Sequence, residues 1–204
     1  TNTGKGSTTN LTLALEKPFD DNWYAKLGYT YGRGRDVNPG TSSVSFSNWS
    51  SRIIGENPND EVSAISNYVF RDRITLAFQY RHFFFDDLPT SFGLFFEGRS
   101  GRPFSFVFQG DANGDNANQS NDLFYVPRGP GDVVFQAILP GQNSQFPNGL
   151  SAAEQEQRFW AYIQNNSYLN SRRGQIVERN ARISPWVSQA DLRISQKLPK
   201  LWQV

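Results

Sequence analysis

The sequence predicts an all-β fold, namely part of a transmembrane antiparallel β-barrel with about five or six strands in view. Three observations predict this fold. Apolar and polar residues alternate with period two in segments of about ten residues, the length of a tilted barrel strand. Short and long connections alternate between these segments. Aromatic residues form 15% of a chain that is only 37% hydrophobic, which favours rings placed at a lipid–water boundary.

The first two predicted strands are Thr9–Lys17 and Trp23 to about Gly34, joined by a turn at Pro18–Asn22. In the first strand, leucines alternate with mostly polar residues. In the second, aromatic residues stand at both ends of one face with aliphatic residues between them, the order expected for a strand that crosses two aromatic girdles. The residues on that face are Trp23, Ala25, Leu27, Tyr29 and Tyr31.

Three further strands follow, with the same alternation. They are Phe70 to about Phe84, Thr90 to about Arg99 and Trp186 to about Lys197. A short turn at Asp86–Pro89 joins the first two of them. Leu201–Val204 is expected to begin a sixth strand. One face of the set is charged, and we interpret it as the wall of a wet lumen; the charged residues are Lys26, Arg73, Arg81, Glu97, Arg99, Asp191, Arg193 and Lys197. A soluble β-sandwich is the alternative.

The long connections, about 35–69 and 100–185, are predicted to be extracellular loops of a single barrel domain that spans 1–204. The second contains two candidate extended pieces, Pro103–Gln109 and Leu123–Val126. It also contains one short helix, from Ser151 to about Asn165, because Ser151 and Glu154 have the spacing of a capping box. We expect its Phe159 and Trp160 to pack against neighbouring loops rather than to contact a partner.

Composition excludes other classes of protein. The net charge is +1, which gives no electrostatic reason to expect nucleic-acid binding. No stretch approaches eighteen consecutive apolar residues, so no transmembrane helix is predicted.

The chain starts at Thr1 and contains no methionine, so we expect it to be an internal portion of a longer protein.

Several segments, in this order and spacing, resemble the barrel of Oar-type TonB-dependent receptors near its C-terminal end. They are Gly28–Asp36, Asn57–Glu61, Phe95–Ser105, Gly110–Asp115 with Asn121–Pro127, and Arg173–Asn180. The resemblance implies a barrel of about twenty-two strands in the outer membrane of a Gram-negative bacterium, closed by an N-terminal plug. It also implies energy-coupled uptake of an unidentified extracellular ligand, driven by the TonB complex through a segment ahead of the plug. The plug, that segment and the closing strands are not in this sequence.

A candidate calcium loop lies within the second long connection. Oxygen-bearing side chains fall at the first, third, fifth, ninth and twelfth positions of a twelve-residue segment, and the seventh offers a carbonyl oxygen, the spacing of an EF-hand loop. The ligands would be Asp111, Asn113, Asp115, Ala117 (carbonyl), Gln119 and Asp122. Asn116 replaces the usual glycine at the sixth position, and Asp122 the usual glutamate at the twelfth. A solvated turn is the alternative, so Ca²⁺ is the only cofactor that the sequence indicates.

No catalytic residue is predicted. His82 is the only histidine, and a Ser–His–Asp hydrolase would need a serine nucleophile and an acid beside it. No Gly-x-Ser-x-Gly motif is present, so we expect His82 to be an aromatic-girdle residue at a strand end. The sequence therefore predicts a transport receptor. Its alternative is a surface-exposed binding or adhesion barrel with calcium-stiffened loops.

Overall fold

The computed structural model describes residues 3–85, 87–117 and 120–199, which divide into two compact units. The strand unit comprises Thr1–Gly40, Glu61–Phe104 and Asn180–Val204. The loop unit comprises Thr41–Asp60 and Ser105–Arg179. Both parts of the loop unit are inserted in long connections between strands, so the connections form a folded body of their own.

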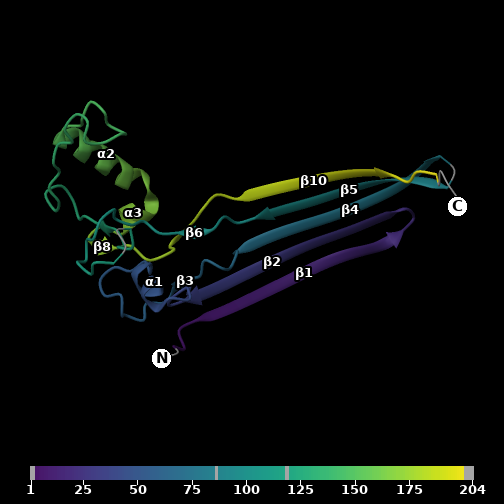
Figure 1. Ribbon diagram of the computed structural model, residues 1–204, viewed down its shortest axis with the longest axis horizontal. Coiled ribbons are helices and arrows are strands. Elements are labelled where there is room, and N and C mark those ends of the chain that lie inside the picture. The colour runs from purple at the N-terminus through teal and green to yellow at the C-terminus, as the bar shows by residue number, and fades with distance from the viewer. Residues whose placement is uncertain (1–2, 86, 118–119, 200–204) are drawn as a thin grey trace. The chain divides into compact units, whose positions relative to one another are not determined.

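The strand unit is an antiparallel sheet with the order β1-β2-β4-β5-β10, whose long strands lie side by side in Figure 1. The strands are β1 (Ser7–Asp20), β2 (Trp23–Asp36), β4 (Asp72–Phe85), β5 (Leu88–Arg99) and β10 (Val187–Gln196). The short β3 (Ala64–Ile65) pairs with the end of β2, and β6 (Pro103–Phe104) pairs with β9 (Arg182–Ile183). The predicted antiparallel β architecture is therefore confirmed, and five of the predicted strands are present.

The register gives the sheet one apolar and one polar face. Leu15, Leu27, Leu76, Phe96 and Ala190 lie in one cross-strand row, and the alternate rows between Trp23 and Tyr29 are also mostly apolar. The intervening rows are mostly polar. Within the described part of the chain, no layer covers the apolar side chains of the edge strands: Leu15 is 74% exposed and Leu192 is 73% exposed. The sheet therefore presents its apolar face to the surrounding medium.

The connections alternate in length as predicted. Asp21 and Asn22 alone separate β1 from β2, and both have positive φ (47° and 67°), the conformation of a two-residue hairpin turn. The predicted turn at Pro18–Asn22 was too long, because β1 continues through Pro18 with a register shift between Lys17 and Asp20. A bulge accommodates a proline, which has no N–H to donate to the ladder. Similarly, β5 begins at Leu88, inside the turn predicted at Asp86–Pro89.

The loop unit has a hydrophobic core, formed by Leu123, Val126, Trp160, Ile163, Leu169 and Val177. Its elements are α1 (Ser45–Ser50), β7 (Tyr125–Val126), α2 (Ala152–Asn165), α3 (Ser167–Ser171) and β8 (Gln175–Ile176). The capping box predicted for α2 is confirmed: the Glu154 N–H donates to Ser151 Oγ (3.2 Å), and the Ser151 N–H donates to the Glu154 carboxylate (3.2 Å). Trp160 is buried in this core and Phe159 packs against it, as expected.

The two predicted extended pieces are formed only in part. In Pro103–Gln109, the β structure is limited to β6 and a β-bridge from Val107 to Leu123. In Leu123–Val126, it is limited to the same bridge and β7. The predicted sixth strand, Leu201–Val204, lies outside the described residues. Among the helices of the described part of the chain, none is long and apolar enough to cross a membrane.

Candidate functional site

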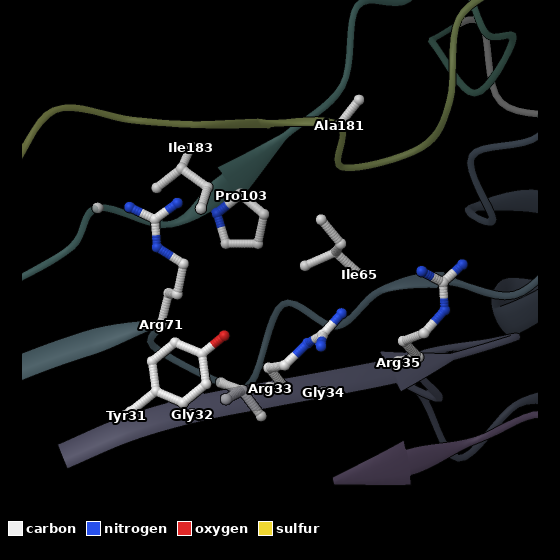
Figure 2. A pocket seen from close by; sticks show the side chains of 12 residues that line it. Tyr31, Gly32, Arg33, Gly34, Arg35, Ile65, Arg71, Pro103, Ala181 and Ile183 are labelled. Atoms are coloured by element: carbon white, nitrogen blue, oxygen red, sulfur yellow. The ribbon is translucent and has the colours of Figure 1, made fainter. Parts of the chain in front are cut away.

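The most distinctive hollow in the strand unit lies at the end of the sheet where the long connections leave it. It has a volume of about 480 Å³. Figure 2 shows the side chains of Tyr31, Arg33 and Arg35 rising from the same side of β2, with Arg71 beside them. The other lining residues are Gly32, Gly34, Ile65, Val69, Gly101, Pro103, Ala181 and Ile183. We call this hollow the arginine pocket.

The pocket occupies a place in the sheet that β4 does not reach. The β6–β9 pair continues the register of the β5–β10 pair, because both chains advance by the same number of residues between Arg99↔Val187 and Pro103↔Ile183. On the other side, β2 continues to Asp36, whereas β4 begins at Asp72, opposite Tyr31. The ends of β2 and β6 therefore have no β4 residue between them.

The segment that precedes β4 packs against two alternate glycines of β2. A Cβ on Gly32 would lie 2.7 Å from Val69 Cγ1, and one on Gly34 would lie 2.6 Å from Val69 Cγ2. Val69 therefore packs directly on the backbone of β2, on the polar face to which these two glycines belong. Because side chains alternate along a strand, Arg33 and Arg35 project from the opposite, apolar face.

The three arginines of the pocket differ in their partners. Arg35 donates to the Ser63 carbonyl oxygen (Nη2, 2.7 Å) and to Ser63 Oγ (Nε, 3.3 Å). Arg71 Nε forms an ion pair with Asp72 Oδ2 at 2.7 Å, and this hydrogen bond raises the pKa of Arg71. Within the described residues, the Arg33 guanidinium makes no hydrogen bond or ion pair. The pocket thus holds a free cation beside two anchored ones.

Aromatic and polar groups surround this pocket on the apolar face. Tyr29 Oη donates to Asp72 Oδ1 at 2.8 Å, so the carboxylate that holds Arg71 is itself held by a tyrosine. A neighbouring hollow of about 400 Å³ shares Arg71, Ala181 and Ile183 with the arginine pocket and is also lined by Trp186. The Trp186 ring lies over Gly98, where an added Cβ would meet its Nε1 at 2.9 Å.

Seven of the eight charges predicted on the polar face lie at strand positions of that face, whereas Lys197 follows the end of β10. Lys26 Nζ pairs with Glu16 (2.8 Å), and Arg73 Nε pairs with Glu97 (2.9 Å), which also lies 3.7 Å from Arg99 Nε. The first two pairs cross between adjacent strands, the third lies within β5, and all are partly exposed. Pairs of this kind contribute little stability but keep the face wet and charged.

In the candidate calcium loop, backbone N–H groups already surround the two end carboxylates. Asp111 accepts from the N–H groups of Gly114 (2.7 Å), Asp115 (3.1 Å) and Asn116 (3.0 Å). Asp122 Oδ2 accepts from Ala112 (2.5 Å) and Asn113 (3.3 Å). Asn116 takes the left-handed conformation (φ 56°) that the sequence required of it. The turn expected from the spacing is therefore formed.

Coordination of a metal by this loop is a separate question. Across the described residues, no three His, Cys, Asp or Glu side chains come together in a group that could hold a metal ion. Asp122 is 1% exposed, and its Oδ1 has no hydrogen-bond partner there. Gln119, one of the predicted ligands, lies outside the described residues. A calcium ion would therefore depend strongly on amide and carbonyl oxygens, from Asn113 and Ala117.

His82 lies among aromatic rings on the apolar face. Its ring makes an edge contact with Phe84 (4.3 Å between centroids) and stacks at 6.2 Å on Tyr80, whose hydroxyl lies 3.4 Å from Nδ1. These contacts are those of an aromatic cluster at a strand end.

Sequence reasoning missed the arginine pocket. It treated Gly32–Arg35 only as a short basic run at a strand end. The available signal was the period-two alternation of β2. In the run Gly32–Arg35, this alternation places both arginine side chains on the face that is apolar in the rest of the strand. What the sequence could not give was the late start of β4 at Asp72, which leaves the ends of β2 and β6 without a β4 residue between them.

Comparison of the chain with protein families, with curated proteins and with solved structures returned no match.

Proposed function

We propose that this chain is a sector of the barrel of an outer-membrane TonB-dependent receptor that takes up an extracellular ligand. The observation that carries the proposal is the exposed apolar face of the sheet. An uncovered apolar surface of this size is unfavourable in water, but it is the surface that lipid covers in a membrane barrel.

The dimensions of that face support the proposal. Its aromatic rows include Trp23 with Tyr80 at the end with short turns, and Tyr31 at the end with long connections. Trp23 and Tyr31 are eight positions apart on β2, or about 26 Å at about 3.3 Å per residue. A tilt of about 40° reduces this to about 20 Å, close to the apolar band of about 25 Å in outer-membrane barrels.

The polar face and the connections support the transport part of the proposal. A face that carries paired charges suits a water-filled lumen, and the insertion of a folded unit in the long connections provides a surface for ligand capture. The mechanism would be binding by these connections, displacement of a plug by the TonB complex, and passage along the polar wall. The resemblance to Oar-type receptors in segments such as Phe95–Ser105 is the second support.

Cysteine labelling of the full-length protein in intact cells tests the membrane part, since these 204 residues contain no cysteine. With a membrane-impermeant maleimide, Asn143→Cys should be labelled from outside and Asn22→Cys only after permeabilisation. Leu13→Cys should be protected, whereas its neighbour Thr12→Cys should react through the lumen. Equal labelling of Leu13→Cys and Thr12→Cys would remove the membrane barrel from consideration.

The transport part has its own test, which is to read the encoding gene upstream of Thr1. A plug-sized domain of about 150 residues supports the receptor. An open reading frame that begins a short distance upstream and encodes no plug would contradict the receptor. The protein would then be a porin, an adhesin or an enzyme barrel.

A second function is supported by the loop at Asp111–Asp122. We infer that it binds Ca²⁺ and stiffens the long connections, which would suit a surface-exposed binding or adhesion barrel as well as a receptor. The preformed turn and the unpartnered, buried oxygen of Asp122 favour it. Unchanged protease cleavage of residues 100–185 when calcium is chelated would count against it.

A further inference from the structure

The arginine pocket lies at a defined position along β2, beyond the start of β4, and Arg33 and Arg35 line it from the apolar face of β2. Its walls begin at Tyr31, the last aromatic residue of β2 on that face, and continue with Arg33 and Arg35 on the same face. If lipid covers the rows from Tyr31 downward, as the proposed function requires, the guanidinium groups stand at the level of lipid headgroups. Arginines at such a boundary direct their charge toward the polar headgroup layer.

The side chains that line the pocket carry only positive charge. Its twelve lining residues include three arginines and no carboxylate. Asp72 compensates Arg71 from outside the lining, and Arg35 has only neutral partners. Arg33 has none among the described residues. Three guanidinium groups that line one pocket are the donors that suit a phosphate, which accepts several charge-assisted hydrogen bonds.

The remaining wall of the pocket is apolar. Ile65, Pro103 and Ile183 lie near the arginines in Figure 2, and Ala181 also lines the pocket. A soluble anion gains nothing from such a wall, whereas a lipid brings an apolar portion beside its phosphate. The combination of a cationic wall, an apolar wall and a position at the end of the lipid-facing surface is what an amphiphilic anion requires.

We propose that the arginine pocket binds the phosphate group of an anionic outer-leaflet lipid. The proposal rests on the proposed membrane function, since it requires that lipid reach this face. Arg33 supplies the uncompensated charge, Arg35 and Arg71 supply the anchored donors, and the lipid's apolar portion lies along the aliphatic wall. A lipid bound in the pocket holds this end of the sheet at the membrane surface, at the place between β2 and β6 that β4 does not reach.

The experiment uses full-length protein in vesicles, with a bimane fluorophore on Ser184→Cys, which lines the neighbouring hollow. Quenching by brominated phosphatidic acid, a phosphate monoester lipid, is compared with quenching by brominated phosphatidylcholine. We expect phosphatidic acid to bind about tenfold more strongly than phosphatidylcholine. One or two basic residues near a membrane surface strengthen the binding of an anionic lipid by about that factor. Arg33→Gln should remove most of this preference and Arg33→Lys should keep much of it.

Arg193→Gln is the matched control, because it removes the same charge from the polar face. It should leave the preference unchanged. Arg33→Gln removes no described hydrogen bond, so the variant should fold; Arg33→Gln with Arg35→Gln should then abolish the preference entirely.

The outcomes separate this proposal from the one on which it rests. Equal quenching by the two lipids overturns the phosphate site but leaves lipid contact with this face intact. Absence of quenching by either lipid contradicts lipid contact and the membrane function together. If inorganic phosphate removes the preference for phosphatidic acid as effectively as excess lipid does, the pocket is a site for a soluble anion and the lipid proposal is wrong.

Discussion

Replacement of Leu15 by arginine tests what the apolar face of the sheet contacts. Leu15 is 74% exposed and pairs with Leu27, which lies midway between Trp23 and Tyr31 on β2. It is therefore about 13 Å along the strand from either aromatic row, or about 10 Å deep at a tilt of about 40°. If water surrounds this face, an exposed arginine changes the free energy of unfolding by no more than about 0.5 kcal/mol.

If lipid surrounds the face, the same substitution places a charge near the middle of the apolar band. The expected loss is then about 2–4 kcal/mol in the free energy of unfolding. Ala14→Arg is the matched control, because Ala14 is the next residue and projects from the polar face opposite Gly28. The assay is urea unfolding of the full-length protein in phosphatidylcholine vesicles, followed by tryptophan fluorescence. Equal unfolding midpoints for the two variants would refute the assignment of the faces.

Four other outcomes are expected. Ser151→Ala removes the cap of α2 and should lower its stability by about 1 kcal/mol, seen as faster amide hydrogen exchange in α2; unchanged exchange would contradict it. The Ser151 hydroxyl lowers the pKa of Glu154 below its ordinary 4.5, so the stabilisation by Glu154 is complete above that value and is lost as the pH falls through the folded-state pKa. Glu154→Gln should abolish this pH dependence of exchange, and persistence in the variant would assign it elsewhere. Gly34→Ala should destabilise the protein by about 1–3 kcal/mol through contact with Val69, and Val69→Ala in the same chain should recover part of the loss in unfolding experiments; simple additivity would exclude the contact as the cause. Calcium should slow tryptic cleavage of residues 100–185, and Asp111→Asn should abolish the effect, whereas equal protection of the variant would place the metal elsewhere.

The strands were predictable because each carries its evidence locally. Alternation in Leu11–Leu15 and Trp23–Tyr31 identifies one apolar face without knowledge of any partner. The errors occur where a local signal was overridden by pairing: Pro18 and Pro89 read as turn residues, but both lie in strands. A bulge accommodates the first, and Pro89 lies near the start of β5.

The arginine pocket and the core of the loop unit were not predictable in the same way. Both depend on segments distant in sequence, such as Ile54 beside Asp122 and Tyr31 near Ile183. Periodicity gives no information about such pairings. The sequence placed Arg33 at the end of a strand and predicted a turn after Asp111, but it gave no information about the surroundings of either.

The construction of the loop unit from two separate connections has a consequence for biogenesis. In an outer-membrane protein, connections on the far side must cross the bilayer, and a packed core is too large to follow a strand hairpin through it. The bridge from Ile54 to Asp122 joins the two connections, so in the proposed outer-membrane barrel it would close only after both have been exported. If the chain is such a barrel, the core around Trp160 and Ile163 would form last, on the cell surface and beyond the reach of periplasmic chaperones, after the strands from β1 to β5 have been inserted.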